Sequence, residues 1–233
     1  LAGENSSYGF GSFDGTNDVV TVSAINENYK SISFWIKPTS TITTGTSVVR
    51  IGTFTGNQYS SFGLGSMTGS LANELIGIYT PGVSAWENAG SASIPNDSWT
   101  HIAFVWDGSK YQIYYNGQPQ TTTTNSDGHT ALQSNKEIRI GAGGTSTTFF
   151  DGDMTGVAFW NKSLEASDIL KIYNGTRHLN LLDNYSDNLI TYQSFGALDS
   201  NTGLADTSST IYDRSGDGNH GTVSGATIQS PPN

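Results

Sequence analysis

Short bursts of alternating apolar and polar residues recur along the chain, and they constrain its fold more than any other feature. The bursts fall at 19–22, 32–36, 48–51, 75–79, 102–106, 112–115, 138–140, 156–160 and 189–195. Because the side chains of a strand point alternately to opposite faces, each burst predicts a β-strand. Asp-Gly and Asn-Gly pairs separate several bursts, and Asn116-Gly117 predicts a two-residue type I′ hairpin turn. The pattern predicts an all-β chain of many short strands joined by turns.

One segment breaks this pattern and predicts a short helix. Ser163 is a candidate N-cap, and Asp168 lies where the positive end of a helix dipole favours carboxylates. Ile169 and Ile172 fall on one face, and Asn174-Gly175 predicts the end of the helix. Further on, 199–210 is polar and predicts a loop, and 226–233 predicts a tail.

Charge and composition exclude several classes of function. The chain has 233 residues, which suits one large β domain, and its 20 acidic against 10 basic residues give a net charge of −10. Such a field repels nucleic acid and anionic membranes, so we expect neither as a partner. The absence of cysteine excludes disulfides and a cysteine nucleophile. No apolar stretch approaches the roughly 18 residues of a membrane span, and Leu1 predicts a processed or excised piece.

Three ordered groups of segments are similar to those of a known family. They are 12–18 with 33–38, 98–108 with 113–117, and 138–142 with 150–152 and the helix that follows. Over about residues 10–175 their order and spacing resemble concanavalin A-like, laminin G-like domains, of the kind found in secreted and phage structural proteins. The resemblance implies an all-β jelly-roll sandwich of two antiparallel sheets with one short helix.

The C-terminal segment departs from the pattern of that family. Residues 188–221 resemble a motif that usually opens such domains, but here the motif comes last. Either residues 188–225 complete a single sandwich spanning 1–233, or they begin a truncated repeat. We favour completion, because roughly 45 residues could not bury a core of their own.

Two sets of oxygen-bearing residues are candidate calcium ligands. Alternate oxygen-bearing residues before and after a turn glycine resemble the first half of a Ca²⁺ loop, although Ser224 stands where such a loop would need its glutamate. These residues could equally form ordinary Asx turns. The candidate metal ligands are Asp213, Ser215, Asp217 and Asn219 in the loop, and Asp14, Asp18, Asp151 and Asp153 in other turns.

Aromatic residues beside amides form a candidate sugar site. An exposed ring can stack on the apolar face of a sugar while amides bind its hydroxyls. The candidate ligand-binding residues are Trp86, Tyr79, Asn88, Tyr59 and Asn57, and the alternative is that these rings fold back on the sheet. Core packing is the favoured interpretation for Trp35, Trp99, Trp106, Trp160 and His101.

Together these features favour binding over catalysis. Glycoside hydrolases share the implied fold, but they need a pair of carboxyl groups, and the glutamates of this chain are isolated. We therefore expect no enzyme activity. The preferred function is a calcium-stabilised module, extracellular or on a virion surface, that binds glycans or cell-surface carbohydrate. The alternative is a structural decoration, fibre or filament subunit, and a homo-oligomer or larger assembly fits either function.

Overall fold

The strands of the chain form two antiparallel sheets. The computed structural model describes residues 9–40, 46–53, 58–64, 77–79, 87–88, 94–121, 134–143, 149–177, 179–196 and 203–230. Within these residues there are two sheets of eight strands and one α-helix. The prediction of an antiparallel two-sheet sandwich with one short helix is confirmed.

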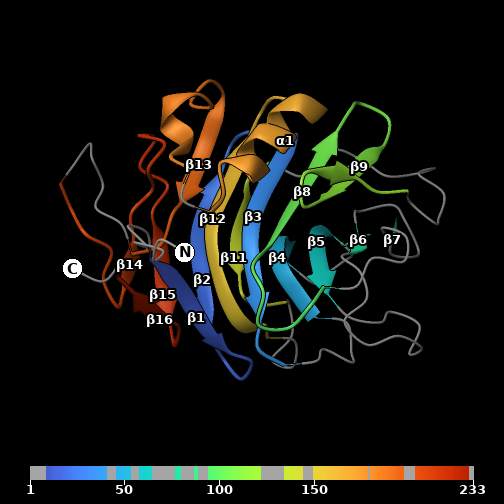
Figure 1. Ribbon diagram of the computed structural model, residues 1–233. Coiled ribbons are helices and arrows are strands. Elements are labelled where there is room, and N and C mark those ends of the chain that lie inside the picture. Colours follow the sequence, from blue (N-terminus) through green and yellow to red (C-terminus); the bar gives the residue numbers. More distant parts are fainter. Residues whose placement is uncertain are drawn as a thin grey trace.

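Sheet A, the first layer, carries the helix (Figure 1). Its strands lie in the order β10-β9-β8-β3-β12-β1-β16, and β13 also pairs with β12. Their bounds in chain order are β1 Phe10–Asp14, β3 Ser31–Pro38, β8 Thr100–Trp106, β9 Tyr111–Tyr115, β10 Gln118–Pro119, β12 Asp151–Trp160, β13 Leu189–Gln193 and β16 Thr227–Gln229.

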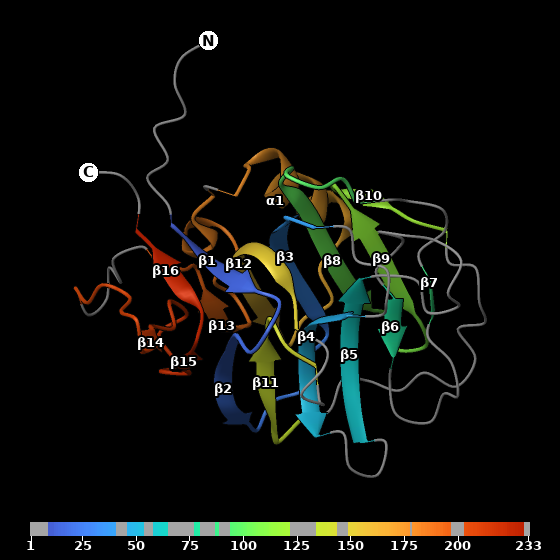
Figure 2. The ribbon, with the colours of Figure 1, turned by 90° about the horizontal axis from the view of Figure 1, so that it is seen from below.

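Sheet B, the second layer, has β2, β11, β4 and β5 side by side (Figure 2). The full order is β14-β15-β2-β11-β4-β5-β6-β7. The bounds in chain order are β2 Val19–Ile25, β4 Thr46–Thr53, β5 Gln58–Leu64, β6 Gly77–Tyr79, β7 Glu87–Asn88, β11 Lys136–Ile140, β14 Thr210–Ile211 and β15 Gly221–Ser224.

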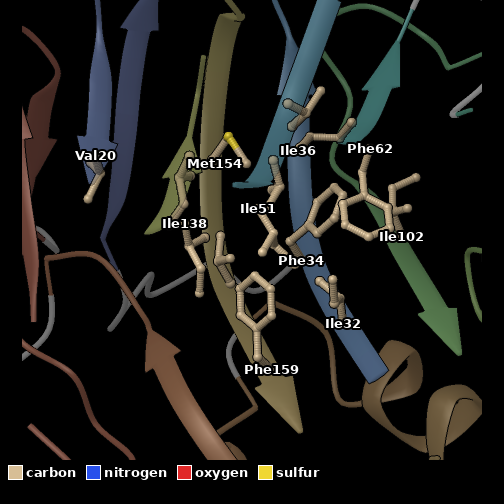
Figure 3. Close-up of a cluster of buried hydrophobic side chains, with 14 of the residues drawn as sticks. Val20, Ile32, Phe34, Ile36, Ile51, Phe62, Ile102, Ile138, Met154 and Phe159 are labelled. Carbon is tan, nitrogen blue, oxygen red and sulfur yellow. The ribbon is translucent and has the colours of Figure 1, made fainter. Parts of the chain in front are cut away.

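The hydrophobic core lies between the two sheets. Phe34 and Phe104 of sheet A meet Phe62 of sheet B, with ring centroids 6.3 Å apart for the first pair and 4.4 Å apart for Phe62 and Phe104. Ile51 and Met154 also point into this layer, and Figure 3 shows both sheets contributing to it. Alternation in each strand sends every second side chain here, which explains why short apolar bursts suffice.

The helix α1, Ala166–Asn174, covers part of the outer face of sheet A (Figure 1). Ile169 and Ile172 are buried against Trp160, which is fully buried and donates a hydrogen bond to the carbonyl of Tyr185. A short 3₁₀ helix, Leu181–Asp183, adds to this second cluster. In the part of the chain that the structure describes, no helix is long and apolar enough to cross a membrane.

Two local predictions around these elements are wrong. Ser163 does not cap the helix, because its hydroxyl donates 2.6 Å to the carbonyl of Trp106, and the N-cap is Glu165 without a side-chain cap. The predicted tail contains β16, which gains backbone partners along β1. In both cases a contact with a distant strand decides the local structure.

The C-terminal strands pair with both sheets. β13 pairs with β12, β16 with β1, and β15 with β2. A buried ion pair, Arg214–Asp206 at 3.6 Å, lies within the same segment. Asp206 also accepts hydrogen bonds from the N–H groups of Gly196 and Tyr212, so it fixes the connection between β13 and β14.

Candidate functional site

The outer face of sheet B carries a polar row across its central strands. Ile138 and Ile140 of β11 are fully buried in the core, so Arg139 between them lies on the outer face. By the same alternation Val49 and Ile51 place Arg50 of β4 on that face. The register sets Arg139 opposite both Arg50 and Thr21 of β2. Two arginines therefore face each other across neighbouring strands.

The two arginines differ in their surroundings. Arg50 is 2% exposed, and its Nε and Nη2 donate to the carbonyl of Gly52 at 2.8 and 2.6 Å. Arg139 is half-buried, and its Nε is a buried donor without a hydrogen-bond partner within the residues described. Both side chains stay charged, because an arginine guanidinium is not deprotonated in proteins. The row thus places two arginine side chains next to each other on this face.

The sequence-predicted sugar ligands fall on or near the same sheet. Trp86 and Asn57 lie outside the described residues, so the structure does not place them. Tyr59, Tyr79 and Asn88 are described through their backbones, which lie in β5, β6 and β7 of sheet B. In the register Arg50 lies opposite Ser61 of β5, and Ser61 lies opposite Tyr79. The row of paired positions therefore runs from the arginines to the backbone of Tyr79.

The predicted calcium loop is a hydrogen-bonded turn. Asp213 is 2% exposed, and its Oδ1 accepts the N–H groups of Tyr192 and Ser215 at 2.8 and 3.0 Å and the Thr191 hydroxyl at 3.3 Å. Its Oδ2 accepts the Ser215 hydroxyl at 2.7 Å and the Asn219 N–H at 2.9 Å. Two carboxylate oxygens offer about four lone-pair sites, so these protein donors occupy the positions that a cation would use. In this arrangement Asp213 does not fit a calcium ligand set.

Two other predicted calcium ligands, Asn219 and Asp217, lie in the same loop. Asn219 donates its side-chain N–H to the carbonyl of Ile190, and Asp217 is exposed. Partial desolvation of its carboxyl group, followed by the charges of Asp213 and Glu27, raises the pKa of Asp217. The loop thus holds β13 in place through Asx-type contacts.

The second acidic set lies where β1 meets β12. Asp14 lies opposite Asp151, and the Asp14 N–H donates to Asp18 at 2.9 Å. Asp151 accepts the hydroxyls of Thr39 and Ser40. Burial raises the pKa of Asp18 and the Asp14 carboxylate adds to that rise, while the Asp14 N–H opposes it.

Asp153, the remaining member of this set, forms an ion pair with Lys37 at 2.7 Å and accepts the Ser12 hydroxyl at the same distance. Among the residues described, no group of three or more His, Cys, Asp or Glu side chains could hold a metal ion. Calcium binding by this chain stays a prediction.

A cluster of aromatic and basic side chains lies around Trp99, next to sheet A. Trp99 is half-buried, with the Lys37 ammonium 5.6 Å and the Arg177 guanidinium 5.1 Å from its ring centroid. Phe10 meets the same indole edge to face at 6.0 Å. Trp35, Trp106 and Trp160 are buried as expected, whereas Trp99 is less buried than the core assignment predicts.

A close Ser–His contact between Ser33 and His101 is structural. The Ser33 hydroxyl lies 2.8 Å from Nε2 of His101, and the two residues are 1% and 0% exposed. Burial lowers the pKa of His101 to about 3, so its imidazole is neutral at pH 7. A substrate cannot reach this pair, and the prediction that His101 belongs to the core is confirmed.

Sequence reasoning missed the opposed arginines. The available signal was a charged residue inside each of two apolar bursts, Val48–Ile51 and Ile138–Ile140. Alternation alone could have placed each arginine on an outer face. Their opposition depends on the pairing of β4 with β11, two strands that are far apart in the chain.

Several solved structures share this fold. A "putative carbohydrate binding protein" from Bacteroides ovatus is 17% identical with a TM-score of 0.68, and the match covers 97% of this chain and 60% of that protein. A heptameric SAP-like pentraxin from Limulus polyphemus is 18% identical with a TM-score of 0.56, covering 73% of this chain and 84% of the other. A leech intramolecular trans-sialidase is 14% identical with a TM-score of 0.50, covering 72% of this chain and 28% of the enzyme.

Sequence comparison defines the family more directly. A search of curated protein sequences finds no match. The family model of the concanavalin A-like lectin/glucanases superfamily matches residues 14–170, which is more than half of the chain. This range begins in β1 and ends in α1, so it includes the central strands of both sheets. The chain therefore belongs to the concanavalin A-like lectin/glucanases superfamily.

Proposed function

We propose that this chain is a non-catalytic carbohydrate-binding module of a secreted or virion-surface protein, with the outer face of sheet B as its binding surface. The observation that carries the proposal is the polar row on that face, which leads from Arg139 and Arg50 along the register to the backbone of Tyr79. The fold supports it, because a structure that covers 97% of this chain is named for carbohydrate binding. The chain spans 60% of that protein, so the task of the whole protein is part of the proposal.

Three buried carboxylates among the described residues support binding over hydrolysis. Glycosidases need two carboxyl groups free to act on opposite sides of the scissile bond. In this chain Asp153 is paired with Lys37, Asp206 with Arg214, and Asp213 with five donors. Such carboxylates are committed to the fold and are poor acids or nucleophiles.

A glycan array with purified protein tests the proposal. We expect specific binding without release of reducing sugar. Tyr79→Ala and Trp86→Ala should weaken binding at least tenfold, while Trp99→Ala, a matched aromatic control directly before β8 of sheet A, should leave it unchanged. Equal losses in all three folded variants would contradict the placement on sheet B.

The array also separates the remaining alternatives. A parallel arm with EDTA tests the calcium prediction, since loss of binding or of thermal stability would establish a cation requirement. If a folded sample binds no glycan, the structural-subunit alternative predicts self-association, which light scattering after size exclusion would detect.

A further inference from the structure

Aspartate is followed by glycine five times in this chain, and each such pair can isomerise spontaneously. The main-chain nitrogen of the glycine attacks the carboxyl carbon of the aspartate, and glycine hinders this attack least because it has no side chain. The structure describes the pairs at Asp14, Asp107, Asp151 and Asp217, while the pair at Asp127 lies outside the described residues. Because both reacting groups must move to meet, the contacts that hold each pair decide its reactivity.

Two of the pairs, Asp14-Gly15 and Asp151-Gly152, are held where β1 meets β12. The Gly15 N–H donates to the carbonyl of Phe150 at 3.1 Å, and Asp14 accepts the N–H of Thr16 at 2.8 Å. The Asp151 carboxylate accepts a threonine and a serine hydroxyl, and Gly152 is paired with a residue of β1. In both pairs, hydrogen bonds have to break before the nitrogen can reach the carboxyl carbon.

The pair Asp107-Gly108 is held through its carboxylate. Oδ1 of Asp107 accepts the N–H groups of Ser109 and Lys110 at 2.8 and 2.9 Å, and the Ser109 hydroxyl at 2.9 Å. The hydrogen bonds from Lys110 and Ser109 lower the pKa of Asp107, so its carboxyl group stays ionised. An ionised carboxylate has no hydroxyl to release, which disfavours the reaction at this pair.

The pair Asp217-Gly218 lacks both restraints. Asp217 is exposed, and within the described residues its carboxylate forms no hydrogen bond or ion pair. The N–H of Gly218 likewise has no acceptor among those residues. Gly218 has a φ of +75°, and apart from its chain neighbours no atom lies within 4 Å of the position that a Cβ would take. Both reacting groups are therefore free to move, and space for a ring is open.

We propose that Asp217 is a site of spontaneous isomerisation to isoaspartate, and the most reactive of the four described Asp-Gly pairs in the folded chain. The Gly218 nitrogen forms a bond to Cγ of Asp217, and its proton leaves with the carboxyl hydroxyl as water, which closes a succinimide ring. Water then opens the ring at the main-chain carbonyl carbon of Asp217 and leaves a free α-carboxylate. One water is released and one is consumed, so no co-reactant is needed. This inference is independent of the proposed carbohydrate binding.

The modification would change a loop that supports the fold. The Asp217 N–H donates to Oγ of Ser215 at 3.3 Å, and the Asn219 N–H donates to Oδ2 of Asp213 at 2.9 Å. Isoaspartate lengthens the backbone between these two anchors by one carbon atom, so both hydrogen bonds cannot keep their geometry. Isomerisation at Asp217 therefore loosens the loop through which Asp213 holds β13.

Incubating the purified chain in heavy-oxygen water at neutral pH tests the proposal. Each ring opening leaves one heavy oxygen in the peptide that has reacted, and electron-transfer fragmentation distinguishes isoaspartate from aspartate. We expect isoaspartate at Asp217 to form about fivefold faster than at Asp14, Asp107 or Asp151, because about one net hydrogen bond has to break at each of these. In urea, which removes the fold, the four pairs should react at similar rates.

Two variants test the assigned nucleophile. Gly218→Ala places a methyl group beside the attacking nitrogen and should suppress isoaspartate at Asp217, whereas Gly203→Ala, also left-handed with open space around it, should leave the rate unchanged. Isomerised protein, separated by chromatography, should unfold at a lower urea concentration than fresh protein. Equal rates at the four pairs in the folded chain, the same ranking in urea, or a wild-type rate in Gly218→Ala would overturn the proposal, and an unchanged urea midpoint would overturn its consequence for the loop.

Discussion

Replacing Asp213 by alanine tests whether the C-terminal loop is held by a carboxylate and not by a cation. The change removes the acceptor of three backbone N–H groups, those of Tyr192, Ser215 and Asn219, at 2.8 to 3.0 Å. Because Asp213 is 2% exposed, water cannot easily replace it. The hydroxyls of Thr191 and Ser215 can rotate to other acceptors, so we leave them out of the sum.

The expected loss follows from those three groups. An unsatisfied buried donor costs about 1 kcal/mol at the low end, so Asp213→Ala should lower the free energy of unfolding by about 3 kcal/mol. For a domain of this size that corresponds to a fall in melting temperature of roughly 6–12 °C. Asp217→Ala, in the same loop but exposed, should change the free energy of unfolding by less than about 0.5 kcal/mol.

Urea denaturation followed by tryptophan fluorescence measures both variants, with calcium and then with EDTA. We expect the wild-type midpoint to be the same in both conditions if hydrogen bonds hold the loop. A loss below about 1 kcal/mol for Asp213→Ala would refute the hydrogen-bond account. A wild-type midpoint that falls with EDTA, by as much as the substitution lowers it, would show that a cation does this work.

Three further changes probe other parts of the fold. The pKa of His101 is about 3 in the folded state against 6.5 ordinarily, so the unfolded chain binds its proton more tightly, and stability should fall as pH drops from 6.5 towards 3. Unfolding free energies at pH 7 and pH 5 should therefore differ less for His101→Gln than for wild type, and an equal difference would contradict this. Asp206→Ala removes a carboxylate that pairs with buried Arg214 and accepts the N–H groups of Gly196 and Tyr212, and should cost about 3 kcal/mol in urea denaturation; a loss under about 1 kcal/mol would count against it. Gly225→Ala adds a Cβ in a left-handed conformation against the Asp18 carboxylate, and should lower the melting temperature more than Gly203→Ala, which is left-handed with open space around it.

The sandwich could be predicted because its signals are local. Alternation identifies a strand without knowledge of its partner, and each of the nine predicted bursts overlaps an observed strand. The hairpin turn is equally local: Asn116 and Gly117 have φ angles of 47° and 74°, as a type I′ turn requires. The short strand β16 carries no such signal, since three residues show too little alternation and their place depends on β1.

Features that depend on two distant segments could not be predicted. Ser163 has the composition of an N-cap, but the carbonyl of Trp106 competes for its hydroxyl. The opposition of Arg50 and Arg139 requires the register of β4 against β11, and a shift of one residue would send one of them into the core. Residue type and local pattern decide what a side chain can do, while register decides what it meets.

Asp213 shows how such pairings turn an apparent binding motif into a structural contact. The pattern around Asp213 resembles a cation loop, but β13 supplies donors to its oxygens, and the carboxylate is used up within the fold. Fully buried groups such as the Tyr29 hydroxyl and Nδ1 of His101 also lack partners in the described part, but no ligand can reach them. The Nε of Arg139 is a buried donor of the same kind, although the residue as a whole is half-buried. An unmet buried donor is therefore not by itself the sign of a ligand site in this chain, and accessibility of the donor atom has to be shown as well.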